Sequence, residues 1–184
     1  VLRNWRRWKR VEQDTLSYGY GISVTALQLA EAFAALADDG RLRRPSLIMD
    51  ALNPPESILD PTLARQVSAM LETVTGPEGT GKKARVENYR VSGKTGTSRK
   101  SGSGGYKERR YIATFAGFAP SSDPKIAGVA IVNDPTNGEY FGGSVAGPLF
   151  SSVMAGALRL MDVPPDNYEG MVAASGTAKS GGGQ

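Results

Sequence analysis

The sequence predicts an α+β fold in which an antiparallel β-sheet is flanked by helices. Residues 25–40 and 60–76 repeat apolar side chains at helical spacing, while residues 91–132 contain three short runs of strand character. Turn residues alone join the second run to the third, and strands connected in this way most simply form an antiparallel meander. The 184-residue length suits one domain, which we expect over residues 1–170, with 171–184 as a disordered tail of Ala, Gly and Ser.

The first predicted helix begins at Thr25. Thr25 and Gln28 have the spacing of a capping box, in which each side chain bonds a free backbone N–H of the first turn. Gly40 is the expected stop, because glycine readily adopts the left-handed conformation that ends helices. The predicted apolar face consists of Ala26, Leu29, Ala30, Phe33, Leu36 and Ala37.

The second predicted helix begins with Asp60 as N-cap and Pro61 as first helical residue. Gly76 is expected to end it. The side chains predicted to line its apolar side are Leu63, Val67, Met70, Leu71 and Val74.

The three predicted strands cover residues 91–97, 111–118 and 126–132. The third has apolar residues in both registers, which predicts burial on both faces. The polar, Gly-rich segment between Arg99 and Arg110 is expected to form a mobile hairpin loop. Pro148 is expected to open a last helix, with Leu149, Val153, Leu160 and Met161 on its apolar side.

The composition excludes several kinds of active site. The chain has no cysteine and no histidine, so thiol nucleophiles, His-based triads and His- or Cys-ligated metals are impossible within it. Covalent catalysis would need Ser or Thr together with Lys or a carboxylate. The net charge of +4 indicates no more than a mild preference for anionic partners. No apolar run has membrane-spanning length and no signal peptide is present; because the first residue is Val, we expect a piece of a longer chain.

Two segments suggest binding functions that we weigh against simpler interpretations. Residues 1–13 place Trp5 and Trp8 among arginines, which is typical of a nucleic-acid or membrane-surface patch, but also of a solvated segment whose tryptophans pack on the body. Residues 76–83 nearly match a phosphate-binding loop. Lys83 stands where the hydroxyl for magnesium is required, and the loop follows a helix instead of a strand. A Gly-rich connection with solvated lysines is therefore the better interpretation, and we expect no nucleic acid as partner.

The organising motif is Lys94-Thr95-Gly96, on the first predicted strand. In the same order as in one known family, the chain also contains similar blocks at residues 17–30, 89–97, 115–120, 140–143, 145–150 and 154–159. Together they resemble the C-terminal half of the transpeptidase domain of class B penicillin-binding proteins, most closely the cell-division type of Gram-negative bacteria. The resemblance implies the penicillin-binding and serine β-lactamase-like fold, whose five-stranded sheet would be incomplete here.

The resemblance implies site residues on and near this strand. Lys94 would supply a cation that stabilises an anionic ligand, and the hydroxyls of Thr95 and Thr97 would bind a substrate carboxylate. Gly96 would let the substrate backbone approach closely, and the Thr97 N–H would form half of the oxyanion hole. The further residues that match substrate-binding positions of the family are Arg99, Tyr111, Tyr140 and Phe141.

Two of the family's three motifs have no credible counterpart. No Ser-x-Asn occurs, and the one Ser-x-x-Lys, Ser122 to Lys125, lies in a turn with Pro124 inside it. A nucleophilic serine of this type needs a helix N-terminus, so that serine and lysine share a face. Ser122 is therefore expected to be inert, and the acylating serine is expected upstream of Val1.

The resemblance implies a D,D-transpeptidase that forms an acyl-enzyme with peptidoglycan stem peptides ending in D-Ala-D-Ala and is inhibited by β-lactams. No metal or organic cofactor is expected. The implied partners are the upstream half of the same domain and division proteins, and the implied location is the periplasmic face of the inner membrane. The alternatives are a D-Ala-D-Ala carboxypeptidase, a serine β-lactamase, or a non-catalytic basic binding module using Arg3 to Arg10.

Overall fold

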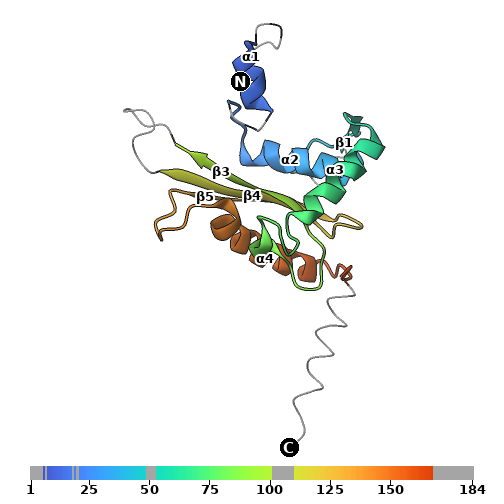
Figure 1. Cartoon of the computed structure of the whole chain (residues 1–184). Coiled ribbons are helices and arrows are strands. Elements are labelled where there is room, and N and C mark those ends of the chain that lie inside the picture. Colours follow the sequence, from blue (N-terminus) through green and yellow to red (C-terminus); the bar gives the residue numbers. More distant parts are fainter. Residues whose placement is uncertain are drawn as a thin grey trace, which may run out of the picture.

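A computed structural model describes Arg6, residues 8–17, Gly19 and residues 21–48, 53–100 and 110–167. The predicted α+β class is confirmed, because three antiparallel strands in the order β3-β4-β5 form a sheet with helices on both faces (Figure 1). The elements in chain order are α1 (Arg10–Leu16), α2 (Ala26–Ala37), β1 (Arg41–Leu42), β2 (Glu56–Ser57), α3 (Pro61–Thr73), the 3₁₀ helix η2 (Lys82–Ala84), β3 (Ser92–Arg99), β4 (Tyr111–Ala119), β5 (Ile126–Asn133) and α4 (Gly142–Leu160).

The sheet register divides the residues of β3 between two faces. Lys94 lies opposite Ala116 of β4, and Thr97 lies opposite Ala113. Since side chains alternate along a strand, Lys94 and Gly96 share the face toward α2 and α3, while Thr95 and Thr97 share the face toward α4. Ser92, two residues before Lys94, hydrogen-bonds the carbonyl of Ser68 in α3, which fixes this assignment.

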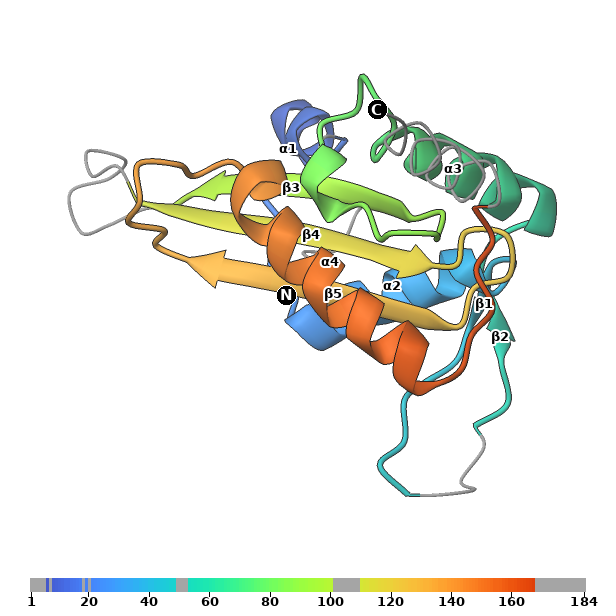
Figure 2. The same cartoon turned by 90° about the horizontal axis from the view of Figure 1, so that it is seen from below.

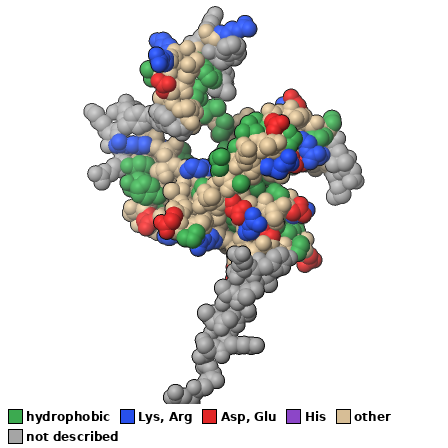
Figure 3. Space-filling view, turned by 45° about the vertical axis from the view of Figure 1, so that its right-hand side comes forward, with side chains coloured by type: hydrophobic (Ala, Val, Ile, Leu, Met, Phe, Trp, Pro, Cys, Tyr) green, Lys and Arg blue, Asp and Glu red, His purple; other side chains and the backbone are tan. Residues whose placement is uncertain are grey.

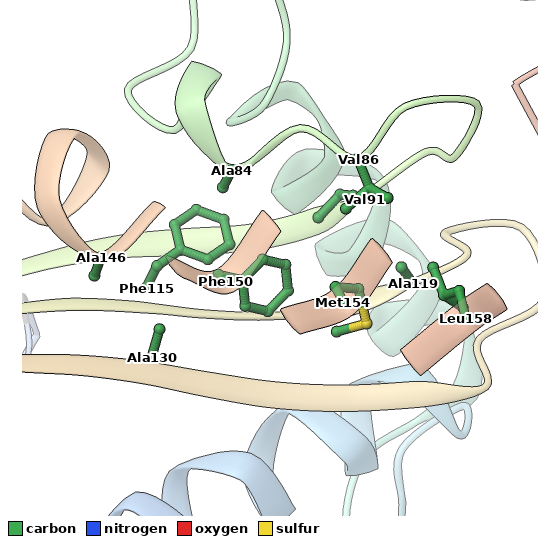
Figure 4. Packing of buried hydrophobic residues seen from close by; sticks show 10 residues of the cluster. All are labelled: Ala84, Val86, Val91, Phe115, Ala119, Ala130, Ala146, Phe150, Met154 and Leu158. Carbon is green, nitrogen blue, oxygen red and sulfur yellow. The ribbon is translucent and has the colours of Figure 1, made fainter. Parts of the chain in front are cut away.

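The hydrophobic core lies between the sheet and α4, which crosses all three strands on one face (Figure 2). Phe115 of β4 and Phe150 of α4 are both buried, with ring centroids 4.7 Å apart. Figure 4 shows their rings side by side, with Met154 and Leu158 continuing the buried row along α4. Burying an aromatic or large aliphatic side chain stabilises the fold by roughly 1.5–3 kcal/mol. This row therefore holds α4, and with it the helix N-terminus, firmly on the sheet.

The predicted helix starts are confirmed for α2 and α3. Thr25 and Gln28 form the expected capping box, and the Asp60 carboxylate accepts the N–H groups of Thr62 and Leu63. These two bonds lower the pKa of Asp60. Gly40 ends the α2 turn with φ of +84°. α3 ends at Thr73, three residues before Gly76.

The predicted apolar faces of α2 and α3 are only partly correct. Leu63 and Met70 are exposed, whereas the fully buried residue of α3 is Ala64. In α2 the buried residue is Ala35, whereas Ala26, which was predicted to lie on the apolar face, is exposed. The two helices pack on each other and on the sheet through their small residues, because a short side chain lets the backbones approach.

The last helix begins earlier than predicted. α4 starts at Gly142, with Phe141 as N-cap, so Pro148 lies inside the helix and does not open it. The earlier start depends on contacts with distant segments. A Cβ on Gly142 would lie 2.3 Å from the Gly96 carbonyl oxygen, and a Cβ on Gly143 would lie 2.0 Å from the Thr80 carbonyl oxygen. The two glycines let the first turn of α4 dock on β3 and on the 76–81 loop.

Burial of the third strand on both faces is also only partly correct. Helices lie on both sides of β5, but Ala130 is its one buried residue and Ile131 is 43% exposed. The disordered tail expected at 171–184 lies outside the described residues. So does most of the mobile loop expected from Arg99 to Arg110, whose ends are described: Arg99 belongs to β3, and the Lys100 N–H bonds the Arg110 carbonyl. Within the described part of the chain, none of the helices has the length and apolar character needed to cross a membrane.

Candidate functional site at the open edge of β3

The outer edge of β3 carries no partner strand among the described residues. Lys100 N–H bonds the Arg110 carbonyl, so the even-numbered residues of β3 direct their peptide groups toward β4. By alternation, the peptide groups of Thr95 and Thr97 point to the outer edge. The Val91 carbonyl agrees with this alternation, because it accepts the Thr75 hydroxyl from α3's end, on the side away from β4. The Thr97 N–H is thus available to a ligand lying along this edge.

Lys94 and Thr95 form a joined pair at this edge. Lys94 is exposed, and its Nζ donates to the Thr95 carbonyl at 3.1 Å and to Thr95 Oγ1 at 3.2 Å. Thr95 is half-buried, and its Oγ1 also lies 3.1 Å from the Oγ1 of Thr80 in the loop before η2. Alternation along β3 places Lys94 and Thr95 on opposite faces of the sheet. The lysine side chain is long enough for its ammonium to reach Thr95 at the strand edge.

Thr97 connects the edge to α4. Its Oγ1 accepts the N–H of Gly142, the first residue of α4, at 3.0 Å. Because a hydroxyl has one proton, Thr97 still has that proton to donate. The neighbouring Gly96 is not required by packing: a Cβ there would lie 3.5 Å from Thr114 Cβ, an ordinary contact. The fold therefore leaves space at Gly96 that a ligand's backbone could use.

The three predicted aromatic residues lie together beside the N-terminus of α4. Tyr111 and Tyr140 stack with ring centroids 4.2 Å apart and an interplanar angle of 16°. Tyr140 also contacts Phe141, whose ring is 4.5 Å away and whose side chain is 58% exposed. Arg99 is opposite Tyr111 in the register and therefore on the same face as Thr97. The three aromatic residues thus form one cluster, with Phe141 as its solvent-exposed member.

Asp134 holds the two ends of the β3–β4 connection. Its carboxylate accepts from Lys100 Nζ at 2.8 Å and from Arg110 Nη2 at 2.5 Å. These hydrogen bonds, that of Arg110 first, lower the pKa of Asp134 from 3.8 to about 2. Lys100 and Arg110 immediately flank Arg99 and Tyr111, so this charge cluster fixes the end of the candidate site.

The Ser122-Asp-Pro-Lys125 sequence lies in the β4–β5 turn, as predicted. Ser122 Oγ donates to Asp166 at 2.8 Å, while Lys125 pairs with Asp123 at 2.6 Å. The lysine therefore does not contact the serine whose proton it would have to take. The turn also supplies no helix N-terminus to activate the hydroxyl.

A hollow lies away from this edge, near the other end of β3. It has a volume of about 550 Å³ and is lined mostly by polar and charged residues between α3 and the chain before β3. Two of its charged residues are paired: Arg90 bonds Glu72 through two nitrogens at 2.7 and 2.8 Å, and this bond lowers the Glu72 pKa. Because this ion pair neutralises Arg90 and Glu72, the exposed Lys94 ammonium and the two hydroxyls at the β3 edge are better suited to an anionic ligand.

Several of the described arginines pair with carboxylates. Arg41 and Arg43 both pair with Asp38, and Arg65 pairs with Asp39. On the face shown in Figure 3, acidic and basic side chains are interspersed. These pairs give no support to a nucleic-acid-binding module; of its four N-terminal arginines, Arg6 and Arg10 are among the described residues and Arg3 and Arg7 are not.

Two residues of this site were not predicted from the sequence as site residues. Thr80 was interpreted only as part of a Gly-rich connection, and Gly142 only as part of a family block. The sequence feature that indicates Thr80 is the Gly-Thr-Gly pattern of residues 79–81, since glycines on both sides let the backbone of the loop approach a neighbouring strand closely. Their contacts join residues 15 and 45 positions apart, which no local pattern reveals.

Comparisons with known proteins agree with the resemblance. The family model described as the penicillin-binding protein transpeptidase domain matches residues 2–155. The probable peptidoglycan D,D-transpeptidase PenA of Neisseria meningitidis is 42% identical over 166 residues, which are 90% of this chain and 29% of that protein. The peptidoglycan D,D-transpeptidase FtsI of Escherichia coli is 42% identical over 162 residues, 88% of this chain and 28% of that protein.

The solved structures give the same result. The apo transpeptidase domain of penicillin-binding protein 3 from Burkholderia pseudomallei superimposes with a TM-score of 0.78 at 45% identity, over 90% of this chain and 51% of that one. A structure described as a peptidoglycan glycosyltransferase from Burkholderia ambifaria gives 0.77 at 42% identity, over 90% and 50%. The chain thus spans less than a third of the length of these two curated relatives and about half of these two solved structures.

Proposed function

The chain belongs to the penicillin-binding protein transpeptidase family, and we propose that it forms the Lys-Thr-Gly wall of a peptidoglycan D,D-transpeptidase active site. The observation that carries this proposal is the open edge of β3. There the Lys94 ammonium, the Thr95 and Thr97 hydroxyls and the outward-facing Thr97 N–H lie within four positions of one strand. This arrangement suits an extended peptide that ends in a carboxylate.

In the proposed reaction, a serine outside this chain attacks the carbonyl carbon of the penultimate D-Ala of a stem peptide. The bond to the terminal D-Ala breaks, that residue leaves as the free amino acid, and an acyl-enzyme remains. An amine of a second stem then attacks the ester and releases the serine, so that the two stems become cross-linked. A β-lactam would acylate the same serine by opening its ring, and the acyl-enzyme would persist.

The residues of this chain bind and orient the substrate in that reaction. The hydroxyls of Thr95 and Thr97 donate to the terminal carboxylate, and the Lys94 cation strengthens this recognition because charge-assisted bonds are stronger than neutral ones. The Thr97 N–H donates to the carbonyl oxygen as it becomes an oxyanion; the loss of one such donor typically costs about 3–4 kcal/mol of transition-state stabilisation. Arg99, Tyr111, Tyr140 and Phe141 form the wall beyond the carboxylate.

The edge of β5 is proposed to receive the remaining part of the same domain. Ile131, Leu149 and Val153 are 43–64% exposed around an apolar groove of about 420 Å³ between β5 and α4. The solved transpeptidase domain is about twice as long as this chain, which supports a further segment of the same polypeptide as the occupant. We further propose that the complete protein acts at the periplasmic face of the inner membrane, in septal synthesis with division proteins.

Labelling of the complete protein with a fluorescent penicillin tests this function. We expect covalent labelling of one serine outside residues 1–184, competed by unlabelled penicillin, and formation of cross-linked product from stem peptides. The isolated 184-residue chain should take up no label. Label on Ser122, or release of hydrolysed product without cross-links, would contradict the proposed assignment.

A further inference from the structure

The 76–81 loop places one hydroxyl directly against the Lys-Thr-Gly strand. Thr80 Oγ1 lies 3.1 Å from Thr95 Oγ1, and the two residues come from separate segments of the chain. The sequence pattern of this loop nearly matches a phosphate-binding loop, but here the loop runs from α3 to η2 and its lysines are exposed. The contact with Thr95 gives the loop a different use.

The position of Thr80 is fixed from three directions. A Cβ on Gly79 would lie 2.0 Å from the Val74 carbonyl oxygen, and one on Gly81 would lie 2.8 Å from the Phe115 ring. The carbonyl of Thr80 itself packs against Gly143 in the first turn of α4. The loop is thus pressed between α3, the core and α4, so its hydroxyl is held in place although Thr80 is exposed.

The hydrogen-bond capacity of Thr95 then determines what Thr80 does. A threonine hydroxyl has one proton and two lone pairs, and a lysine ammonium has donors only. Lys94 Nζ therefore fills one lone pair of Thr95 Oγ1. If Thr80 donates, it fills the second lone pair, and the Thr95 proton must point away from both. A carboxylate ligand accepts hydrogen bonds and donates none, so its binding selects this arrangement.

We propose that Thr80 is a positioning residue which, by donating to Thr95, directs the Thr95 proton toward the carboxylate of the ligand. Thr80 does not touch the ligand and acts through Thr95. Thr97 reaches the same state by another route, because the Gly142 N–H occupies its oxygen and leaves its proton free. The two threonines thus both act as donors toward one anionic group. This inference rests on the proposed function and adds to it the means by which carboxylate recognition is set.

The test measures second-order acylation rates in the complete protein with two ligands, a penicillin and its methyl ester. Thr80→Val should lower the rate for the free carboxylate by about three- to tenfold, the size of one neutral hydrogen bond, and change the ester rate by less than twofold. Thr80→Ser should restore the wild-type rates. In a Thr95→Val background, Thr80→Val should have no further effect, because the residue through which it acts is gone.

A matched control is Thr73→Val, since Thr73 is an exposed threonine whose hydroxyl donates to the Met70 carbonyl in its own helix. It should change neither rate. If Thr80→Val lowers the acylation rates of the acid and the ester equally, the role of Thr80 is merely structural. If neither rate changes, Thr80 has no role in acylation. Either result overturns the inference but leaves the proposed function intact, provided that penicillin labels the wild type. Absence of labelling in the wild type would instead overturn the proposed function, and the inference with it.

Discussion

The two edge strands of the sheet differ in how they are built. β3 presents an ammonium, two hydroxyls and outward peptide groups, and its side chains are held by hydrogen bonds to Thr80 and Gly142. β5 presents apolar side chains next to the exposed Leu149 and Val153 of α4, around an apolar groove. β4 pairs with both strands, so they belong to one sheet and one core.

The difference indicates two kinds of occupant. A small anionic ligand needs few contacts of high directionality, which fixed hydroxyls and a cation provide. A protein segment that stays in place permanently needs apolar area, because burial supplies about 25 cal/mol per Å². Substitutions at β3 should therefore change acylation more than stability, and substitutions at β5 should do the reverse.

The largest effect is expected for Lys94→Ala in the complete protein. Loss of the cation should lower the second-order acylation rate by about 100-fold, because the carboxylate loses its charge-assisted recognition and Thr95 Oγ1 loses the donor that orders its hydroxyl. Stopped-flow measurement with a chromogenic β-lactam provides the rate. Lys125→Ala is the matched control, because Lys125 is an exposed lysine paired with Asp123 in the β4–β5 turn, and it should acylate like the wild type. If Lys94→Ala is acylated at a rate within twofold of the wild type, the proposal that the β3 edge binds the ligand is wrong.

Thr97→Val should lower acylation less than Lys94→Ala does, but it should also lower the free energy of unfolding. Losing one charge-assisted hydrogen bond of roughly 1.5–3 kcal/mol should lower acylation about ten- to a hundred-fold. The same change removes the acceptor of the Gly142 N–H, so the free energy of unfolding should also fall by about 1 kcal/mol. Thr97→Ser keeps both bonds and should stay close to the wild type in both. Acylation by Thr97→Val at the wild-type rate would mean that the carboxylate is bound elsewhere.

Val153→Asp tests the apolar edge. If a further segment of the domain covers Val153, the buried charge should lower the free energy of unfolding of the complete protein by about 2 kcal/mol. Val153→Thr is the uncharged control of similar shape and should cost less. Denaturant titration measures both, and the acylation rate of the folded fraction should not change. A cost below about 0.5 kcal/mol for Val153→Asp, as is usual at a solvated position, would show that this edge stays exposed.

The smallest effect concerns acid stability. Because Lys100 and Arg110 lower the pKa of Asp134 to about 2, its carboxylate stabilises the fold above its ordinary pKa near 3.8. That contribution should be lost as the pH falls from about 4 to about 2. Asp134→Asn should therefore be less stable than the wild type at pH 7, with the difference vanishing near pH 2. Asp123→Asn, whose side chain is 76% exposed, serves as control in the same thermal melts. An unchanged difference across this range would contradict the assignment.

The sequence by itself determined the features that depend on neighbouring residues. The helix caps at Thr25 and Asp60 form contacts within one helical turn, so the sequence alone predicts them and the structure confirms them. The strands at 111–118 and 126–132 are predictable because each is a short apolar run between turns, and the strand at 91–97 is predictable from its Lys-Thr-Gly motif. Lys94-Thr95-Gly96 and its surrounding blocks also identified the family, since a motif on one strand is contiguous in the chain. The proline inside Ser122 to Lys125 likewise excluded a helix there.

The tertiary structure alone decided the features that depend on contacts between distant segments. α4 begins at Gly142 and not at Pro148 because two glycines allow its first turn to dock on β3 and on Thr80. Ala64, and not Leu63 or Met70, is buried in α3, because close packing of helix on sheet there admits only a small side chain. The hydroxyl of Thr95 acquires its partner from a loop 15 residues earlier, and that of Thr97 from a helix 45 residues later. Hydrogen-bond direction is a property of such assembled neighbours, and a linear pattern of residue types does not contain it.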